Sequence, residues 1–199
     1  MHAWPTYLRV DAHVYGLHPR RDDGGEAGSH RMEVVMRVLV AYGSKAGGTA
    51  GIAKAVGNLL AQAGYAVEVC DARSAGELGG FDGVVVGSSL YTGRWHADSL
   101  KLIKRLSAAG YRGPVWVFHS GPLGEDADQP QPLPKRVSAV LGDLDVRSTA
   151  TFGGRLDEHP KGMLARAMAR SVAGDYRDWA DIARWTDQIA TGLEAESAA

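Results

Sequence analysis

Short apolar segments alternate along the chain with stretches in which apolar residues recur at helical spacing. The apolar segments lie between glycine, proline and polar clusters, which is typical of strands. One of them, Val84-Val85-Val86, is continuously apolar, as in strands that are covered on both faces. The pattern predicts strands over Val34–Tyr42, Ala66–Asp71, Phe81–Gly87, Gly113–Phe118 and Val146–Phe152.

Between the strands, apolar residues at every third or fourth position predict amphipathic helices. Ile52, Val56 and Leu60 form such a stripe after the first strand. Ser74–Leu78 is expected to form a turn or a short helical piece, and Asp98 is expected to be the N-cap of the helix that follows the third strand. The predicted helices are Ala50–Ala63, Asp98–Ala109, Pro134–Leu141, Met163–Ala173 and Ala180–Leu193.

The alternation of strands and helices predicts an α/β protein, a three-layer sandwich in which a five-stranded parallel sheet has helices on both faces. Right-handed crossovers leave few strand orders, and we expect the order 2-1-3-4-5. In that order the topological switch point lies between strands one and three, and ligands bind there, outside the carboxyl ends of the strands. The loops after these two strands are therefore the first candidates for a binding site.

The first residues have a different character from the rest of the chain. Residues 1–31 combine prolines, histidines and Arg20-Arg21-Asp22-Asp23-Gly24-Gly25 with no sustained period. They also lack the apolar core and cleavage pattern of a signal peptide. We expect 1–31 to be a disordered or mis-started arm, with Met32 and Met36 as natural starts, and 32–199 to form one domain.

Composition narrows the function classes. The chain has 199 residues and a formal net charge of −1, so no global field favours nucleic acid as a partner. Its single cysteine, Cys70, excludes an internal disulfide and a cysteine-based metal cluster, and we expect no metal site and a reducing, cytoplasmic setting. No apolar run reaches the ~20 residues that a helix needs to cross a bilayer.

The loop after the first strand has the composition of an anion-binding turn. Glycines let the backbone approach an anion closely, and the N–H groups at the start of the following helix favour negative charge. The spacing of Gly43, Gly47 and Gly48 fits neither the Walker A pattern nor the dinucleotide pattern. An ordinary strand–turn–helix without a ligand is the alternative. The candidate phosphate-binding residues are Ser44, Lys45, Ala46, Gly47, Gly48 and Thr49.

The loops after the third and fourth strands carry further hydrogen-bond donors and aromatic rings. Two interpretations of Trp95 stay open: stacking on a bound ring, or packing on the following helix. His96 is either a donor to the ligand or a cap, and Glu125–Pro134 either covers the site or is solvated. The candidate ring-binding residues are Ser88, Ser89, Leu90, Tyr91, Thr92, Gly93 and Trp95 on one side, with Ser120 and Gly121 on the other.

Three segments together resemble a known family. They are the Ser44-x-x-Gly47-Gly48-Thr49 loop, the Gly87-x-Ser89-x-x-x-Gly93-x-x-His96 loop, and the Asp178-Trp179 pair that opens the last helix. They resemble the flavodoxin-domain proteins that include menaquinone-dependent protoporphyrinogen oxidase. The likeness spans roughly Met36 to Leu193, with Ala46 in place of the usual hydroxyl residue.

The resemblance implies a flavodoxin-like fold with noncovalent FMN. It also implies an FMN-dependent oxidoreductase that transfers reducing equivalents between a reduced substrate and a quinone-type or other acceptor. The acidic, proline-rich stretch after the fourth strand differs from the basic one of bacterial porphyrinogen oxidases. No acid–base pair stands out, so no residue is assigned as catalytic.

Two other classes of function remain open. A non-enzymatic FMN electron carrier that docks to redox partners is one, although such carriers are typically strongly acidic and this chain is not. A signalling domain without flavin is the other, but Ala41-Tyr42-Gly43-Ser44 lacks the acidic cluster that a response regulator needs there. Basic and apolar residues over 161–172 are compatible with peripheral membrane contact, or with a helix that packs on the core and leaves its charges solvated.

Overall fold

The computed structural model describes residues 35–127, 129–157, 163, 169 and 171–198. The arm predicted over 1–31 lies outside these residues, as do most of the helix predicted over Met163–Ala173 and of the proposed membrane contact. The main elements are β1 (Arg37–Gly43), α1 (Gly48–Gln62), β2 (Ala66–Asp71), β3 (Gly83–Tyr91), β4 (Arg94–Trp95), α2 (Ala97–Ala108), β5 (Val115–Ser120), α3 (Lys135–Leu141), β6 (Val146–Phe152) and α5 (Trp179–Ser197).

Five parallel strands form the central sheet in the order β2-β1-β3-β5-β6. This order is the predicted 2-1-3-4-5 when the five strands are numbered along the chain. Val40 of β1 pairs with Val69 on one side and with Val85 on the other, so β1 is an interior strand, and its residues from Val38 to Ala41 are fully buried. The α/β sandwich that the sequence predicted is confirmed.

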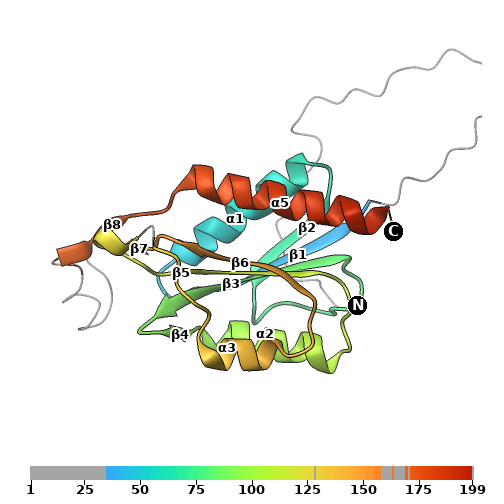
Figure 1. Ribbon diagram of the computed structural model, residues 1–199, viewed down its shortest axis with the longest axis horizontal. Coiled ribbons are helices and arrows are strands. Elements are labelled where there is room, and N and C mark those ends of the chain that lie inside the picture. The colour runs from blue at the N-terminus through green and yellow to red at the C-terminus, as the bar shows by residue number, and fades with distance from the viewer. Residues whose placement is uncertain (1–34, 128, 158–162, 164–168, 170, 199) are drawn as a thin grey trace, which may run out of the picture. The chain divides into compact units, whose positions relative to one another are not determined.

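Helices cover both faces of the sheet, α1 and α5 on one and α2 and α3 on the other (Figure 1). Ile52 and Leu60 of α1 pack with Ile189 of α5 against β1 and β3, and all three are fully buried. Leu102 and Leu106 of α2 are equally buried on the opposite face. The apolar stripes read from the sequence are therefore the faces that pack on the sheet.

The third strand is longer than predicted. It continues past Gly87 to Tyr91 and pairs antiparallel with β4. The two residues between these strands, Thr92 and Gly93, have φ of 49° and 71°, which makes a tight two-residue hairpin turn. The expected loop after strand three is thus largely a β-hairpin, which we call the 89–95 hairpin.

Two local details also differ from the sequence analysis. His96, not Asp98, is the N-cap of α2, and its Nδ1 atom accepts a hydrogen bond from the Asp98 amide. After β6, a short antiparallel ladder forms between β7 (Arg155–Leu156) and β8 (Gly174–Asp175), which no periodicity indicated. The last helix begins as expected, since the Asp178 carboxylate accepts hydrogen bonds from two amides of its first turn.

Candidate functional site

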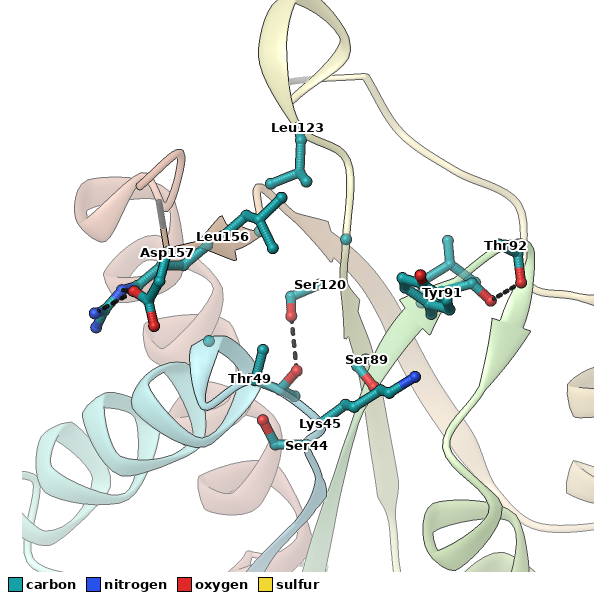
Figure 2. Close-up of a pocket in the computed structure, with 16 residues that line it drawn as sticks. Ser44, Lys45, Thr49, Ser89, Tyr91, Thr92, Ser120, Leu123, Leu156 and Asp157 are labelled. Carbon is teal, nitrogen blue, oxygen red and sulfur yellow. Dashed lines mark hydrogen bonds and ion pairs between the residues drawn. The ribbon is translucent and has the colours of Figure 1, made fainter. Parts of the chain in front are cut away.

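A cavity of about 460 Å³ opens at the carboxyl ends of β1, β3 and β5. Its volume lies within the usual range of small-molecule and cofactor sites. It lies at the predicted switch point, between the loop after β1 and the 89–95 hairpin (Figure 2). The predicted residues that line it are Ser44, Lys45, Ala46, Gly48, Thr49, Ser89, Leu90, Tyr91, Thr92, Ser120 and Gly121.

The loop after β1, the candidate anion-binding loop, leads directly into the first turn of α1. Gly47 lies in the left-handed region at φ 83° and is the N-cap of α1, without a side-chain cap. The first intrahelical hydrogen bond joins the Gly51 amide to the Gly47 carbonyl at 3.0 Å, so the amides of Gly48, Thr49 and Ala50 have no acceptor within the helix. No acidic residue lies in this first turn. These donors suit the phosphate end of a cofactor.

The hydroxyls of this loop have partners inside the protein. Ser44 Oγ accepts a 3.0 Å hydrogen bond from the Gly47 amide, which fixes the turn. Thr49 Oγ1 lies 2.8 Å from Ser120 Oγ, and both residues are buried. The second bond ties the start of α1 to the end of β5 and holds two walls of the cavity together (Figure 2).

The 89–95 hairpin supplies the aromatic wall. The ammonium group of Lys45 lies 4.6 Å from the centre of the Tyr91 ring, a cation–π contact between the anion-binding loop and the hairpin (Figure 2). Gly121 comes so close to this hairpin that a Cβ atom there would lie 2.3 Å from the Leu90 carbonyl oxygen. Any larger residue at 121 would therefore push the hairpin outward and change the width of the cavity.

Sequence reasoning missed the remaining wall. Residues after β6 close the cavity because Gly153 and Gly154 let this segment run against Tyr176, just after β8, and against the segment after β5. The Gly154 amide donates to the Pro122 carbonyl at 2.8 Å, and the Tyr176 amide donates to the Gly154 carbonyl at 3.0 Å. The Gly-Gly pair directly after a strand was the only sequence signal. The additional lining residues are Leu123, Gly154, Arg155, Leu156 and Asp157.

Two arginines flank the start of α1, each beside an aspartate. The Arg155 guanidinium binds Asp157 at 2.7 Å. Arg177 forms an ion pair with Asp175, and a Cβ atom on Gly51 would lie 2.2 Å from Arg177 Nη1. The bond from Arg177 holds the pKa of Asp175 below its ordinary value. The Arg177 guanidinium therefore lies beside the first turn of α1, and the main chain and Cβ of Arg155 lie beside Gly48.

Four predicted site residues lie outside the cavity. Gly47 fixes the turn of the anion-binding loop, and Gly93 forms the tip of the hairpin. Ser88 is fully buried, and its Oγ accepts a 2.8 Å bond from the His96 amide. The indole of Trp95 is 6% exposed and belongs to the core on the α2 side of the sheet, so it is not placed to stack on a ring in the cavity.

A buried histidine holds Trp95 in this position. Trp95 Nε1 donates to His119 Nδ1 at 3.1 Å, and His119 Nε2 lies 3.0 Å from Thr151 Oγ1. Burial lowers the pKa of His119 to about 4, so its imidazole is neutral near pH 7. Thr151 Oγ1 also bonds the main chain of Gln131. The acidic, proline-rich segment is thus tied to β6 here, and none of its described residues lines the cavity, whereas Leu123 just before it does.

Two negative findings concern only the described residues. No group of three or more histidine, cysteine or acidic side chains is arranged to hold a metal ion within that part of the chain. Over the same residues, none of the helices is long and apolar enough to cross a membrane.

Comparisons with known proteins agree with this geometry. A family model described as a flavodoxin domain matches residues 39–177. A flavodoxin from the domain Archaea is 17% identical, with a TM-score of 0.55, and the match covers 80% of this chain and 99% of that one. A short-chain flavodoxin associated with a non-canonical PDU bacterial microcompartment is 12% identical, with a TM-score of 0.57, and the match covers 80% of this chain and 99% of that one.

A third structural match is a part of a larger protein. Rubredoxin oxygen:oxidoreductase from Desulfovibrio gigas is 16% identical, with a TM-score of 0.54, and the match covers 82% of this chain and 37% of that one. No curated protein sequence matches this chain. At these identities the structural matches show the fold alone, and they lend no support to the narrower resemblance to protoporphyrinogen oxidase.

Proposed function

Because this chain belongs to the flavodoxin domain family, we propose that it is an FMN-binding oxidoreductase. It would transfer reducing equivalents between a reduced substrate and a quinone-type or other acceptor. The observation that carries the proposal is the cavity itself. One end has free amides and flanking arginines that suit a phosphate, and the other end has the Tyr91 ring and main chain that suit a flat ring.

Different residues of the cavity would bind the phosphate and the ring of FMN. Gly48 and Thr49 offer main-chain donors to the phosphate, and Lys45 adds a positive charge between that end and Tyr91. Tyr91 and the Ser120–Gly121 segment bound the space for the ring. FMN supplies the redox chemistry when it is bound, and the protein binds, orients and shields it.

Two considerations favour an enzyme over a simple electron carrier. The formal net charge of −1 provides little long-range field for steering a carrier to its partners. One structural neighbour is by its name an oxidoreductase, of which a flavodoxin-like part covers 37%. An electron carrier remains the alternative, and protoporphyrinogen is one substrate to be tested rather than the one we propose.

The first experiment is an absorption spectrum of the purified chain after incubation with FMN and desalting. Retained absorption bands at ~375 and ~450 nm would support the proposal, because they would come from flavin that stays bound to the protein. A colourless protein that refuses FMN would overturn it. The flavin-loaded chain would then be assayed for NAD(P)H and protoporphyrinogen oxidation with menaquinone. If no donor is turned over but the chain transfers electrons rapidly to a protein acceptor, the electron-carrier alternative is favoured.

A further inference from the structure

A second groove, of about 710 Å³, lies between α2 and α3 beside the short strand β4. These three elements lie on the same side of the sheet (Figure 1). None of the lining residues is acidic, whereas five of them are basic. The basic residues of this groove, which we call the α2–α3 groove, are Arg94, Lys101, Lys104, Lys135 and Arg136.

Most of these charges are not compensated. All five side chains are exposed. Lys101 Nζ lies 3.0 Å from Asp98 Oδ1, but Arg94, Lys104, Lys135 and Arg136 make no ion pair with any described residue. Since the whole chain has a net charge of −1, this concentration of positive charge is local. Such a patch attracts negative groups most strongly at low ionic strength.

The floor of the groove is apolar. Trp95 and Val137 are buried beneath it, and Leu100 and Pro134 are partly buried. An apolar centre with a charged rim is the usual anatomy of a protein interface. The charges surround a hollow rather than forming a plane. This shape fits a protruding acidic segment better than the flat surface of a bilayer.

The groove shares a wall with the proposed flavin site. Leu90, Tyr91 and Thr92 of the 89–95 hairpin line the cavity, whereas Gly93, Arg94 and Trp95 line the groove. A molecule bound in the groove is therefore separated from the cavity only by the 89–95 hairpin. This neighbourhood would suit a redox partner of the chain.

We propose that the α2–α3 groove binds an acidic segment of a partner protein beside the flavin cavity. Complementary charge steers such a partner to the groove, and the apolar floor adds buried area once it is bound. Only the redox role of this partner rests on the function proposed above. The binding site itself does not.

The test uses the full chain and poly-L-glutamate as the acidic probe, with binding followed by calorimetry at low salt. The triple variant K104Q/K135Q/R136Q should bind about eightfold more weakly, because each of three exposed ion pairs contributes a factor of about two. The control variant K54Q/R112Q/R184Q removes the same charge from exposed positions outside the groove and should bind within about twofold of the wild type.

Several outcomes would overturn the proposal. One is no binding of poly-L-glutamate, and another is an equal loss in the two triple variants, which would mean that only net charge is sensed. A third is binding to phosphatidylglycerol vesicles that the K104Q/K135Q/R136Q variant loses while poly-L-glutamate never binds, because the groove would then face a membrane. No arm needs flavin, so a colourless chain that binds the probe through the groove would refute the FMN proposal alone.

Discussion

Replacing Arg155 by glutamine should weaken the binding of FMN and leave the binding of riboflavin unchanged. Arg155 lines the cavity, and its main-chain nitrogen lies 3.3 Å from the place where a Cβ atom on Gly48 would be. Its side chain therefore starts beside the first turn of α1, and we expect its guanidinium to turn to a phosphate bound there. Riboflavin has the same ring without the phosphate, so it separates the two ends of the site.

The size of the effect follows from exposure and from the existing ion pair. A hydrogen bond to a charged group stabilises by about 1.5–3 kcal/mol, and the lower value applies because the Arg155 side chain is 47% exposed. Turning to the phosphate would weaken the bond to Asp157, which at an exposed site is worth about 0.5 kcal/mol. The net loss on substitution is about 1 kcal/mol, or about fivefold in the FMN dissociation constant.

Quenching of flavin fluorescence measures both dissociation constants. The variant D157N releases Arg155 from its partner, so it should bind FMN about twofold more tightly. R112Q, which removes the same charge at an exposed site outside the cavity, is the matched control. Unchanged FMN affinity in R155Q, or an equal loss for riboflavin, would refute the assignment of Arg155 to the phosphate.

Three further predictions concern the walls of the cavity. T49V should lower the free energy of unfolding in urea by about 1–3 kcal/mol because it leaves Ser120 Oγ unpaired. The double variant T49V/S120A should regain part of the stability that T49V loses. If the losses of T49V and S120A simply add in the double variant, the two hydroxyls are not coupled. G121A should weaken FMN binding and lower stability by about 1–3 kcal/mol through the clash with the hairpin, whereas G76A, with open space around it, should not. The folded state binds a proton on His119 less tightly than the unfolded state does, because burial lowers the pKa of His119 from 6.5 to about 4. The free energy of unfolding should therefore fall by about 3 kcal/mol as the pH is lowered from 6.5 to 4. The variant H119Q should show a smaller fall over this range, and an unchanged fall would refute the assignment.

The sequence was sufficient for features that depend on neighbouring residues in the chain. The strands could be found because apolar runs such as Val84–Val86 are buried on both faces. The turn before α1 could be located because its glycines and the helix start lie within a few consecutive residues. Right-handed crossovers reduced the possible strand orders to a few, and the expected order 2-1-3-4-5 was one of the two common doubly wound orders.

Only the tertiary structure decided how distant segments complete the site. Thr49 and Ser120 meet although 71 positions separate them, and Arg155 reaches the cavity through the ladder between β7 and β8, whose short strands have no period to read. Trp95 faces the core because it pairs with Leu90 across a hairpin that no local pattern indicated, and because His119 accepts its N–H. Hydrophobic periodicity reports which face of an element is buried. Which side chains then meet depends on register and on contacts between segments, and these are properties of the folded chain.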